Sequence, residues 1–232
     1  MIINVFLPCK RISRRVPNKN KKRFASNKYG LFQIKINQLL NSKKINSIVL
    51  STNDRQLISY TKLLEKKKII VHEREDKNLS NDNATVEDLI DHAMKIMPRG
   101  HILWTHVTSP FVSSKIYDKI ILEYIKAIKS GKYDSLMTVS KISGYVWNNK
   151  RALSYDSKIE KWPKTQNIKP LNKVNSAVFL SSIDNYKKFK DRIGKRPLMH
   201  SLEHPLGFDI DNIDDFRFAE TVFKKNKNIY FK

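Results

Sequence analysis

The chain opens with MIINVFLPCKRISRRVPNKN, residues 1–20, in which an apolar run passes directly into a loop rich in lysine and arginine. The apolar part, at about Ile2–Leu7, has the length and composition of a buried strand. It lacks a basic region before it and a small-residue cleavage site after it, so we do not expect a signal peptide. The polar part, Pro8–Asn20, lies where this strand ends, and α/β sheets bind their ligands at the carboxyl ends of strands.

Strand and helix patterns alternate along the rest of the chain. Further strands are predicted at about 47–51, 69–71, 102–104, 134–140, 174–180 and 208–211. Apolar residues at helical spacing predict helices between them, including one that ends at Asn41 and a last one over 214–224. We expect Asn83 or Thr85, and then Ser113 or Ser114, to begin two of these helices. This alternation predicts an α/β fold with three layers, Rossmann-like, in which helices cover both faces of a mostly parallel sheet.

The segment 143–172 breaks this alternation. It is polar and aromatic, with Tyr145, Trp147 and Trp162, and it has no clear period. Long irregular segments in compact domains are often functional or form interfaces. We therefore expect a single domain over residues 1–232 with a small insertion at 143–172, whose aromatic side chains pack together or make subunit contacts.

The composition excludes several classes of protein. Hydrophobic residues make up 40% of the chain, which is too many for a disordered tail. No apolar run approaches the roughly 18 residues needed to span a bilayer. The only cysteine is Cys9, so an internal disulfide is excluded. These features are typical of a soluble cytoplasmic protein.

The formal net charge of +23 has two interpretations. A strongly basic protein often binds nucleic acid through the phosphates. The lysines are, however, spread along the whole chain, which favours solvated lysine faces. The segment 10–23 differs because it concentrates lysine and arginine, and it is either a local anion site or a basic tail.

The loop Pro8–Asn20 contains the groups that a triphosphate site needs. Such a site requires several cations close together and backbone N–H groups. Lys10, Arg14 and Lys19 supply cations, and Ser13 supplies a hydroxyl. The P-loop pattern is absent. The charges alone would favour a solvated basic loop, and its position directly after the first strand is what favours phosphate binding.

Six short motifs follow one another between residues 7 and 220. The loop shares Pro8, Ser13, Arg15, Pro17, Lys19 and Asn20 with the pattern P-A-R-G-G-S-K-R-I-P-x-K-N. The remaining motifs are Ser51-Thr52-Asn53-Asp54, His72-Glu73-Arg74 with Leu79, Asp82, Ala84 and Thr85, Thr105-His106-Val107-Thr108-Ser109-Pro110, Asn175-Ser176-Ala177, and Phe208-Asp209-Ile210-Asp211 with Asp215, Phe216, Ala219 and Glu220. In this order they resemble the acylneuraminate cytidylyltransferase (CMP-sialic acid synthetase) family.

The resemblance implies a nucleotidyltransferase fold and a Mg²⁺-dependent reaction. The anomeric hydroxyl of a nonulosonic, sialic-type acid would attack the α-phosphorus of CTP, and pyrophosphate would leave, in surface-glycan biosynthesis. Such catalysis is mostly positioning and neutralisation of phosphate charge. The resemblance also implies a homodimer, with neither nucleic acid nor a membrane as a partner.

The resemblance further assigns roles to residues of this chain. The catalytic residues that it implies are Lys10, Lys19, Asp209 and Asp211, of which Asp209 and Asp211 would bind the metal. The nucleotide would contact Lys10, Ser13, Arg14, Lys19, Asn20, Arg74, Asp82 and Thr85. The sugar acid would contact His106, Thr108, Ser109 and Asn175.

A physical argument also supports metal binding by Asp209 and Asp211. Two positions apart on a strand, their side chains would project from one face. Mg²⁺ usually takes one or two carboxylates together with phosphate oxygens. The alternative is a polar strand end at which Asp211 or Asp214 caps the last helix.

The sequence departs from the family pattern in several places. Arg11-Ile12 replaces Gly-Gly, and Lys10 gives a point charge where the family has the fork of an arginine. His106 replaces a glutamine, and a lone histidine is more often structural or solvated than catalytic. Asn175 is either a residue of the binding pocket or an asparagine that only begins a strand and has no functional role. Two other functions therefore stay open: a related sugar nucleotidyltransferase with another sugar or nucleotide, and a catalytically degenerate basic protein whose strip 10–23 binds nucleic acid.

Overall fold

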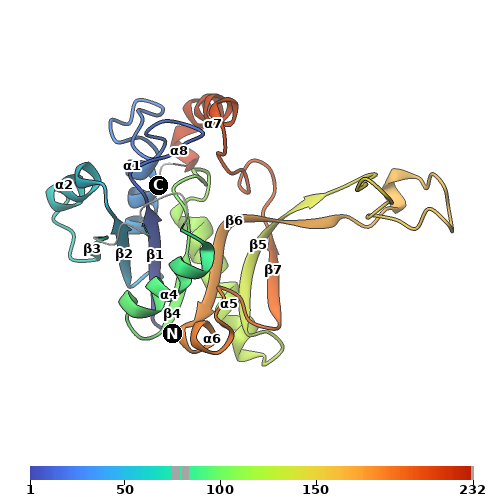
Figure 1. The fold of residues 1–232 in the computed structure, drawn as a ribbon, viewed down its shortest axis with the longest axis horizontal. Coiled ribbons are helices and arrows are strands. Elements are labelled where there is room, and N and C mark those ends of the chain that lie inside the picture. Colours follow the sequence, from blue (N-terminus) through green and yellow to red (C-terminus); the bar gives the residue numbers. More distant parts are fainter. Residues whose placement is uncertain (75–78, 80–83, 231–232) are drawn as a thin grey trace.

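The computed structural model describes residues 1–74, 79 and 84–230 of the chain. A seven-stranded sheet runs through the molecule in the order β3-β2-β1-β4-β6-β5-β7 (Figure 1). The strands are β1 (Ile3–Cys9), β2 (Ser47–Thr52), β3 (Ile69–Glu73), β4 (His101–Trp104), β5 (Ser135–Ile142), β6 (Leu171–Ser182) and β7 (Pro197–Ser201). The helices of the described residues are α1 (Gly30–Asn41), α2 (Arg55–Leu63), α4 (Val86–Ile96), α5 (Ser114–Lys129), α6 (Ile183–Phe189), α7 (Ile213–Lys225) and α8 (Lys227–Tyr230), with a short 3₁₀ turn at Thr165–Asn167.

The sheet is mostly parallel, which confirms the predicted fold class. β1 pairs in parallel with β2 and β4, β2 with β3, and β5 with β7. β6 is antiparallel to both of its neighbours, β4 and β5. The loops after β1, β2, β3 and β4 therefore meet at one edge of the sheet, as the predicted alternation requires.

The core has two layers because both faces of the sheet are buried. Along β1, Ile3, Val5 and Leu7 pack on one face, and Phe6 packs on the other. The first face is covered by α1, α5 and α7, and the second by α4 and α6. Alternate residues of one apolar strand thus supply two different packing surfaces.

Three local predictions need correction. Residues 208–211 form no strand, because the N–H groups of Phe208 and Ile210 donate to the carbonyls of Pro205 and Thr108 within loops. α6 and β7 were not predicted, since both are too short to show a period. The last helix is capped by neither Asp211 nor Asp214: the side chain of Asn212 accepts from the N–H groups of residues 214 and 215.

Two predicted helix starts agree with the structure. Thr85 caps α4, and Asp88 completes a capping box with it. Ser113 occupies the N-cap position of α5, although its side chain makes no capping bond there. Asn83, the alternative start of α4, lies outside the described residues.

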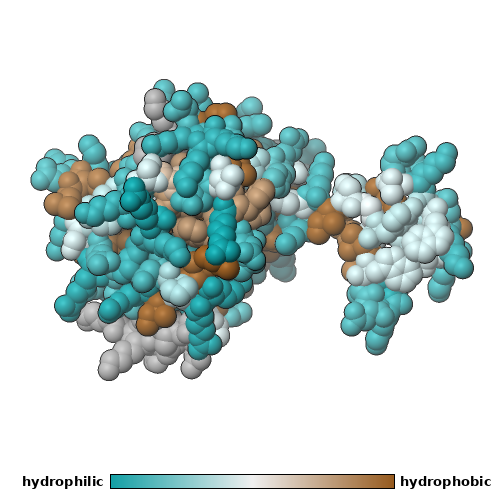
Figure 2. Space-filling model, turned by 90° about the horizontal axis from the view of Figure 1, so that it is seen from above, coloured by the Kyte–Doolittle hydropathy of each residue, from teal (hydrophilic) through white to brown (hydrophobic). Residues whose placement is uncertain are grey.

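The segment 143–170 forms an arm that projects from the ends of β5 and β6 (Figures 1 and 2). Tyr145 holds its base together: its ring lies 5.3 Å from that of Trp162 and 5.5 Å from that of Tyr155, and its hydroxyl donates to the carbonyl of Pro163. Ile159 is 86% exposed and Trp162 is 63% exposed. The arm thus presents apolar side chains to solvent. Among the described residues, no helix has the length and apolar character to cross a membrane.

Candidate active site

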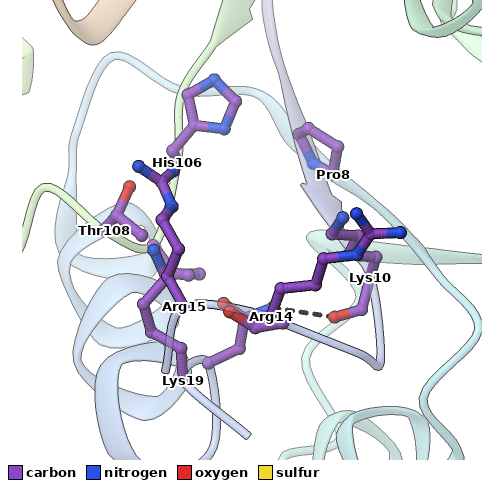
Figure 3. A pocket seen from close by; sticks show the side chains of 10 residues that line it. Pro8, Lys10, Arg14, Arg15, Lys19, His106 and Thr108 are labelled. Carbon is purple, nitrogen blue, oxygen red and sulfur yellow. Dashed lines mark hydrogen bonds between the residues drawn. The ribbon is translucent and has the colours of Figure 1, made fainter. Parts of the chain in front are cut away.

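A cavity of about 430 Å³ lies at the carboxyl ends of β1 and β4 (Figure 3). In Figure 3, Pro8 and Lys10 stand on one side of it with the end of Arg14, His106 and Thr108 stand on the other with the end of Arg15, and Lys19 lies beneath them. The full lining is Pro8, Lys10, Ser13, Arg14, Arg15, Lys19, Asn20, His106, Val107 and Thr108. Most of the residues predicted to bind the nucleotide are therefore brought together.

The loop after β1 is held in this shape by its own backbone and by Asn20. The N–H of Lys19 donates to the carbonyl of Val16, and Asn18 adopts a left-handed conformation with φ 55°. The side-chain amide of Asn20 donates to the carbonyl of Lys10, and this bond closes the loop. Val16 is fully buried, so the loop is anchored in the core while its cations line the cavity.

Lys19 connects this loop to the segment that carries the two aspartates. Its Nζ donates to the carbonyl of Ile210 at 2.7 Å, and the residue is 8% exposed. Burial lowers the pKa of Lys19, while the carboxylate of Asp209 opposes that shift. A cation that is so placed is costly to leave without an anion, which favours a negatively charged ligand in the cavity.

Asp209 and Asp211 lie in different environments. Asp211 forms an ion pair of 2.8 Å with Arg15, and both side chains are more than half exposed. Asp209 is bonded to the side chain of Thr108, while its Oδ1 is buried and has no hydrogen-bond partner within the described ranges. Burial raises the pKa of Asp209. An orphaned carboxylate oxygen at the edge of a cavity is the kind of atom that a bound cation satisfies.

A second cavity, of about 800 Å³, adjoins the aspartates at the base of the arm. Its walls include Lys141, Lys173, Asn175, Asp209 and Asp211. It therefore differs from the first cavity in having both acidic and basic side chains.

Asn175 is fixed in the wall of this second cavity by three bonds. Its Oδ1 accepts from the hydroxyl of Thr138 and the N–H of Ala177, and its Nδ2 donates to Ser140. A side-chain carbon at position 207 would collide with Ser140 Oγ and Asn175 Nδ2, so Gly207 lets the loop before Asp209 lie against this wall.

Arg74 lines a third cavity, of about 660 Å³, rather than the first. It is 5% exposed, and its guanidinium donates to the carbonyls of Ser51 and Leu79. Its Nε is buried and has no partner in the part of the chain that the structure describes. Lys21 and Asp54 form an ion pair of 2.7 Å in the same wall.

Besides Arg74, Asp209 and Asp211, three more of the predicted site residues do not line the first cavity. Thr85 is exposed and caps α4. Ser109 is 1% exposed, its carbonyl accepts from Lys35, and its hydroxyl has no partner among the described residues. Asn175 belongs to the second cavity. The prediction for Asp82 lies outside the described residues.

His106 lies in the first cavity next to Trp104. The indole N–H of Trp104 donates to Nε2 of His106 at 3.1 Å. Burial lowers the pKa of His106 from its usual value to about 3, and the positive charges of Arg192, Lys35 and Lys19 contribute to the shift. The imidazole is therefore neutral at physiological pH.

Lys35 was missed in the sequence. It is fully buried, and its Nζ donates to the Ser109 carbonyl and the Tyr117 hydroxyl at 2.8 Å each. Burial holds its pKa well below the usual value. The lysine thereby ties α1 to the loop that carries His106 and Thr108. A lysine four residues from both Leu31 and Leu39, on the apolar stripe of a helix, is the signal that would have identified it.

Arg15 was also left out of the predicted site, although it matches the loop motif. It lines the cavity and pairs with Asp211. No group of three or more His, Cys, Asp or Glu side chains arranged to hold a metal occurs in the described ranges. Any metal here would thus need oxygens from a ligand as well as Asp209 and Asp211.

Comparisons with known proteins agree with this geometry. A family model described as Cytidylyltransferase matches residues 6–230. Two relatives named pseudaminic acid cytidylyltransferase, from Campylobacter jejuni subsp. jejuni serotypes O:2 and O:23/36, are each 25% identical over 232 residues. Each alignment covers 97% of this chain and 97% of the relative.

Solved structures are similar in fold. A CMP:2-keto-3-deoxy-manno-octonic acid synthetase complexed with CTP has a TM-score of 0.64 and 12% identity, over 97% of this chain and 100% of that one. A 4-diphosphocytidyl-2C-methyl-D-erythritol synthase from Anaerococcus prevotii has a TM-score of 0.61 and 12% identity, over 96% of both chains. At these identities the likeness shows the fold alone.

Proposed function

The chain belongs to the cytidylyltransferase family, and from that premise we propose that it transfers CMP from CTP to a nonulosonic acid and releases pyrophosphate. The two relatives are named for pseudaminic acid, so this sugar acid is the acceptor that we propose. The observation that carries the proposal is the pair of cavities at this edge of the sheet. The first is cationic and lies at the end of β1, and the second is larger and has Asp209 in its wall.

The reaction joins the anomeric oxygen of the sugar acid to the α-phosphorus of CTP. The bond from that phosphorus to the bridging oxygen breaks, the proton of the anomeric hydroxyl passes to solvent, and negative charge moves onto the leaving pyrophosphate. Lys10, Arg14 and Lys19 are the side chains that we propose to bind the phosphates, because all three line the first cavity. Cations in place before the reaction stabilise the developing charge without reorganisation.

We propose that the sugar acid binds in the second cavity. A volume of about 800 Å³ is within the range of sites for small ligands. The ammonium groups of Lys141 and Lys173 are the proposed partners of its carboxylate, and the fixed amide of Asn175 is a proposed partner of its hydroxyl groups. Asp209 and Asp211 line the same cavity, so the reacting groups would meet at the aspartates.

A magnesium ion fits the residues that are present. Asp209 has a buried oxygen without a partner among the described residues. Asp211 pairs with Arg15 at an exposed position, and such a pair costs little to replace by a bound cation. These two carboxylates would hold the ion, which when bound neutralises phosphate charge. The chain's own cations orient the triphosphate beside it.

We also propose a homodimer in which the arm, residues 143–170, makes the subunit contact. Exposed Ile159 and Trp162 support this proposal, because large apolar side chains that project from a domain are typical of interaction sites. The arm stands clear of its own domain, where a second subunit has access to it (Figure 2).

The decisive experiment is an assay of pyrophosphate release from CTP and Mg²⁺ with a panel of nonulosonic acids. We expect release that needs both CTP and one acid, with pseudaminic acid the first to test and a CMP-sugar identified by mass. UTP, ATP and GTP are the controls. No release with any acid from folded protein that binds CTP would refute the proposed function.

A further inference from the structure

The hydrogen bond between Trp104 and His106 determines where the imidazole carries its proton. An indole nitrogen is a donor only, so Nε2 of His106 must accept this bond with its lone pair. A neutral imidazole that accepts at Nε2 carries its hydrogen at Nδ1. His106 is therefore a hydrogen-bond donor at Nδ1.

Burial first, and then the charged neighbours of His106, keep the imidazole in this state. Arg192, in the segment between α6 and β7, stacks on the ring of Trp104 at 5.1 Å and on that of Phe179 at 4.0 Å. Lys35 on α1 and Lys19 in the loop after β1 also contribute positive charge at its ring. Each of these cations opposes a second proton on the imidazole. A cation over the indole face also withdraws electron density from it and strengthens its N–H as a donor.

The protonated nitrogen faces the cavity. Figure 3 shows one nitrogen of the His106 ring directed across the open space toward Pro8, while the other points out of the group of cavity residues. Because Trp104 occupies Nε2, the nitrogen that faces the cavity is Nδ1.

We propose that His106 is a fixed hydrogen-bond donor to an anionic oxygen of the substrates, held in its Nδ1–H form by Trp104, and not the base that deprotonates the attacking hydroxyl. The oxygen belongs to a phosphate of CTP or to the carboxylate of the sugar acid. The assignment of the ligand rests on the proposed function, whereas the tautomer does not. Trp104 and Arg192 are then positioning residues that act through His106 without touching the substrate.

The tautomer is tested on the ligand-free protein by ¹⁵N NMR of the imidazole between pH 5 and 8. We expect His106 to keep a hydrogen on Nδ1 throughout, and Trp104→Phe to let it titrate nearer to the usual 6.5. Tyr124→Phe is the matched control, because it removes a 2.8 Å partner from His101 on the same strand. A wild-type His106 that carries hydrogen on Nε2, or that titrates in this range, would overturn the proposal.

The role is tested by two substitutions. His106→Asn keeps an N–H near the place of Nδ1 but has no basic nitrogen, and His106→Leu has neither group. We expect His106→Asn to retain pyrophosphate release within about tenfold of wild type, and His106→Leu to lose roughly 10²-fold, which is typical for the loss of one catalytic donor. If both variants are equally inactive, or if neither loses activity, the donor role is wrong.

Two binding measurements identify the oxygen. A weaker Kd for CTP alone in His106→Leu assigns the donor to a phosphate, and a raised KM for the sugar acid at unchanged CTP affinity assigns it to the carboxylate. A change in neither constant would refute a ligand contact. If wild-type protein releases no pyrophosphate with any acid, the proposed function fails, while the NMR result on the tautomer still stands.

Discussion

At the scale of single residues, the most informative atoms are buried polar atoms with no partner. Asp209 Oδ1 is one of them, and it lies beside a cavity that also contains Asp211. Burying such an atom without a partner costs about 1–3 kcal/mol, so its place at a cavity edge points to a ligand. Lys35 is the opposite case, because its buried amine is bonded to Ser109 and Tyr117.

The first prediction concerns Asp209→Asn, which keeps the shape of the side chain and removes its charge. We expect kcat to fall by roughly 10²-fold or more, because the metal and the phosphates lose a preorganised charge. The melting temperature should stay the same or rise, since burial already disfavours this carboxylate. Steady-state kinetics over a range of Mg²⁺ concentrations measure the effect. Asp214→Asn, at an exposed position in the first turn of α7, is the control, and wild-type turnover in Asp209→Asn would rule out the metal site.

The second prediction concerns the pH dependence of stability in Lys35→Met. Burial holds the pKa of the folded amine well below its usual value, while the unfolded amine titrates at about 10.4. Between the folded and the unfolded pKa, unfolding therefore takes up a proton, so this group makes the protein more stable as pH rises toward 10 and less stable as pH falls. Lys35→Met should remove a contribution of up to about 1.4 kcal/mol per pH unit from the slope of unfolding free energy against pH. Urea unfolding from pH 7 to 10 checks this, with Lys115→Met on the surface as the control; equal slopes would contradict it.

At the scale of elements, the segment 202–212 between β7 and α7 positions the aspartates. Its path depends on the absence of a side chain at Gly207 and on the cap that Asn212 gives to α7. Its backbone bonds go to the loop after β4, where the N–H of Ile210 donates to the carbonyl of Thr108. This bond links two loops that lie far apart in sequence.

The third prediction concerns Gly207→Ala. The added carbon collides with Ser140 Oγ and Asn175 Nδ2, so the wall of the second cavity must shift. We expect KM for the sugar acid to rise about tenfold, in proportion to one perturbed binding contact, while the affinity for CTP stays unchanged. Adding Ser140→Ala removes one of the colliding atoms and should restore part of the loss. A loss confined to CTP binding would contradict the assignment of the two cavities.

At the scale of the whole molecule, the arm and the net charge are the dominant features. Residues 143–170 leave the domain at the ends of β5 and β6, and the side chains at the arm's tip belong to neither core cluster (Figure 1). The net charge of +23 is spread along the chain, and much of the basic loop faces a cavity.

The fourth prediction concerns replacement of residues 145–163 by a short Gly-Ser linker. We expect a folded monomer whose melting temperature, at a concentration where wild type is dissociated, is within a few degrees of wild type. The reason is that the removed side chains contribute to no core cluster. Light scattering measures the mass. A monomeric wild-type protein at working concentration would refute the proposed dimer.

The fifth prediction separates an enzyme from a basic nucleic-acid-binding protein. We expect CTP with Mg²⁺ to bind in the presence of duplex DNA as tightly as in its absence. Any DNA binding should be weak and should fall steeply with salt, because it would come from scattered lysines. Fluorescence titrations at two salt concentrations test this, and tight DNA binding that CTP abolishes would favour the alternative.

Several features followed from the sequence alone because their causes are local. The alternation of apolar strands and amphipathic helices predicts an α/β sheet wherever the periods are long enough, and β1 with its basic loop is the clearest case. Most of the cationic side chains of the first cavity could be predicted for the same reason, since Lys10, Arg14 and Lys19 lie within ten residues of one another. The motif order along the chain predicted the family that the comparison then confirmed.

Other features were decided only by the tertiary structure, because they depend on contacts between residues far apart in the chain. Residues 208–211 look like a strand in isolation, and only the bond from Ile210 to Thr108 makes them a loop. Lys19 meets the carbonyl of Ile210, 191 positions away, and Arg192 reaches Trp104 from another element. Burial, the orphaned oxygen of Asp209 and the tautomer of His106 all arise from such contacts, and no local pattern of residues encodes them.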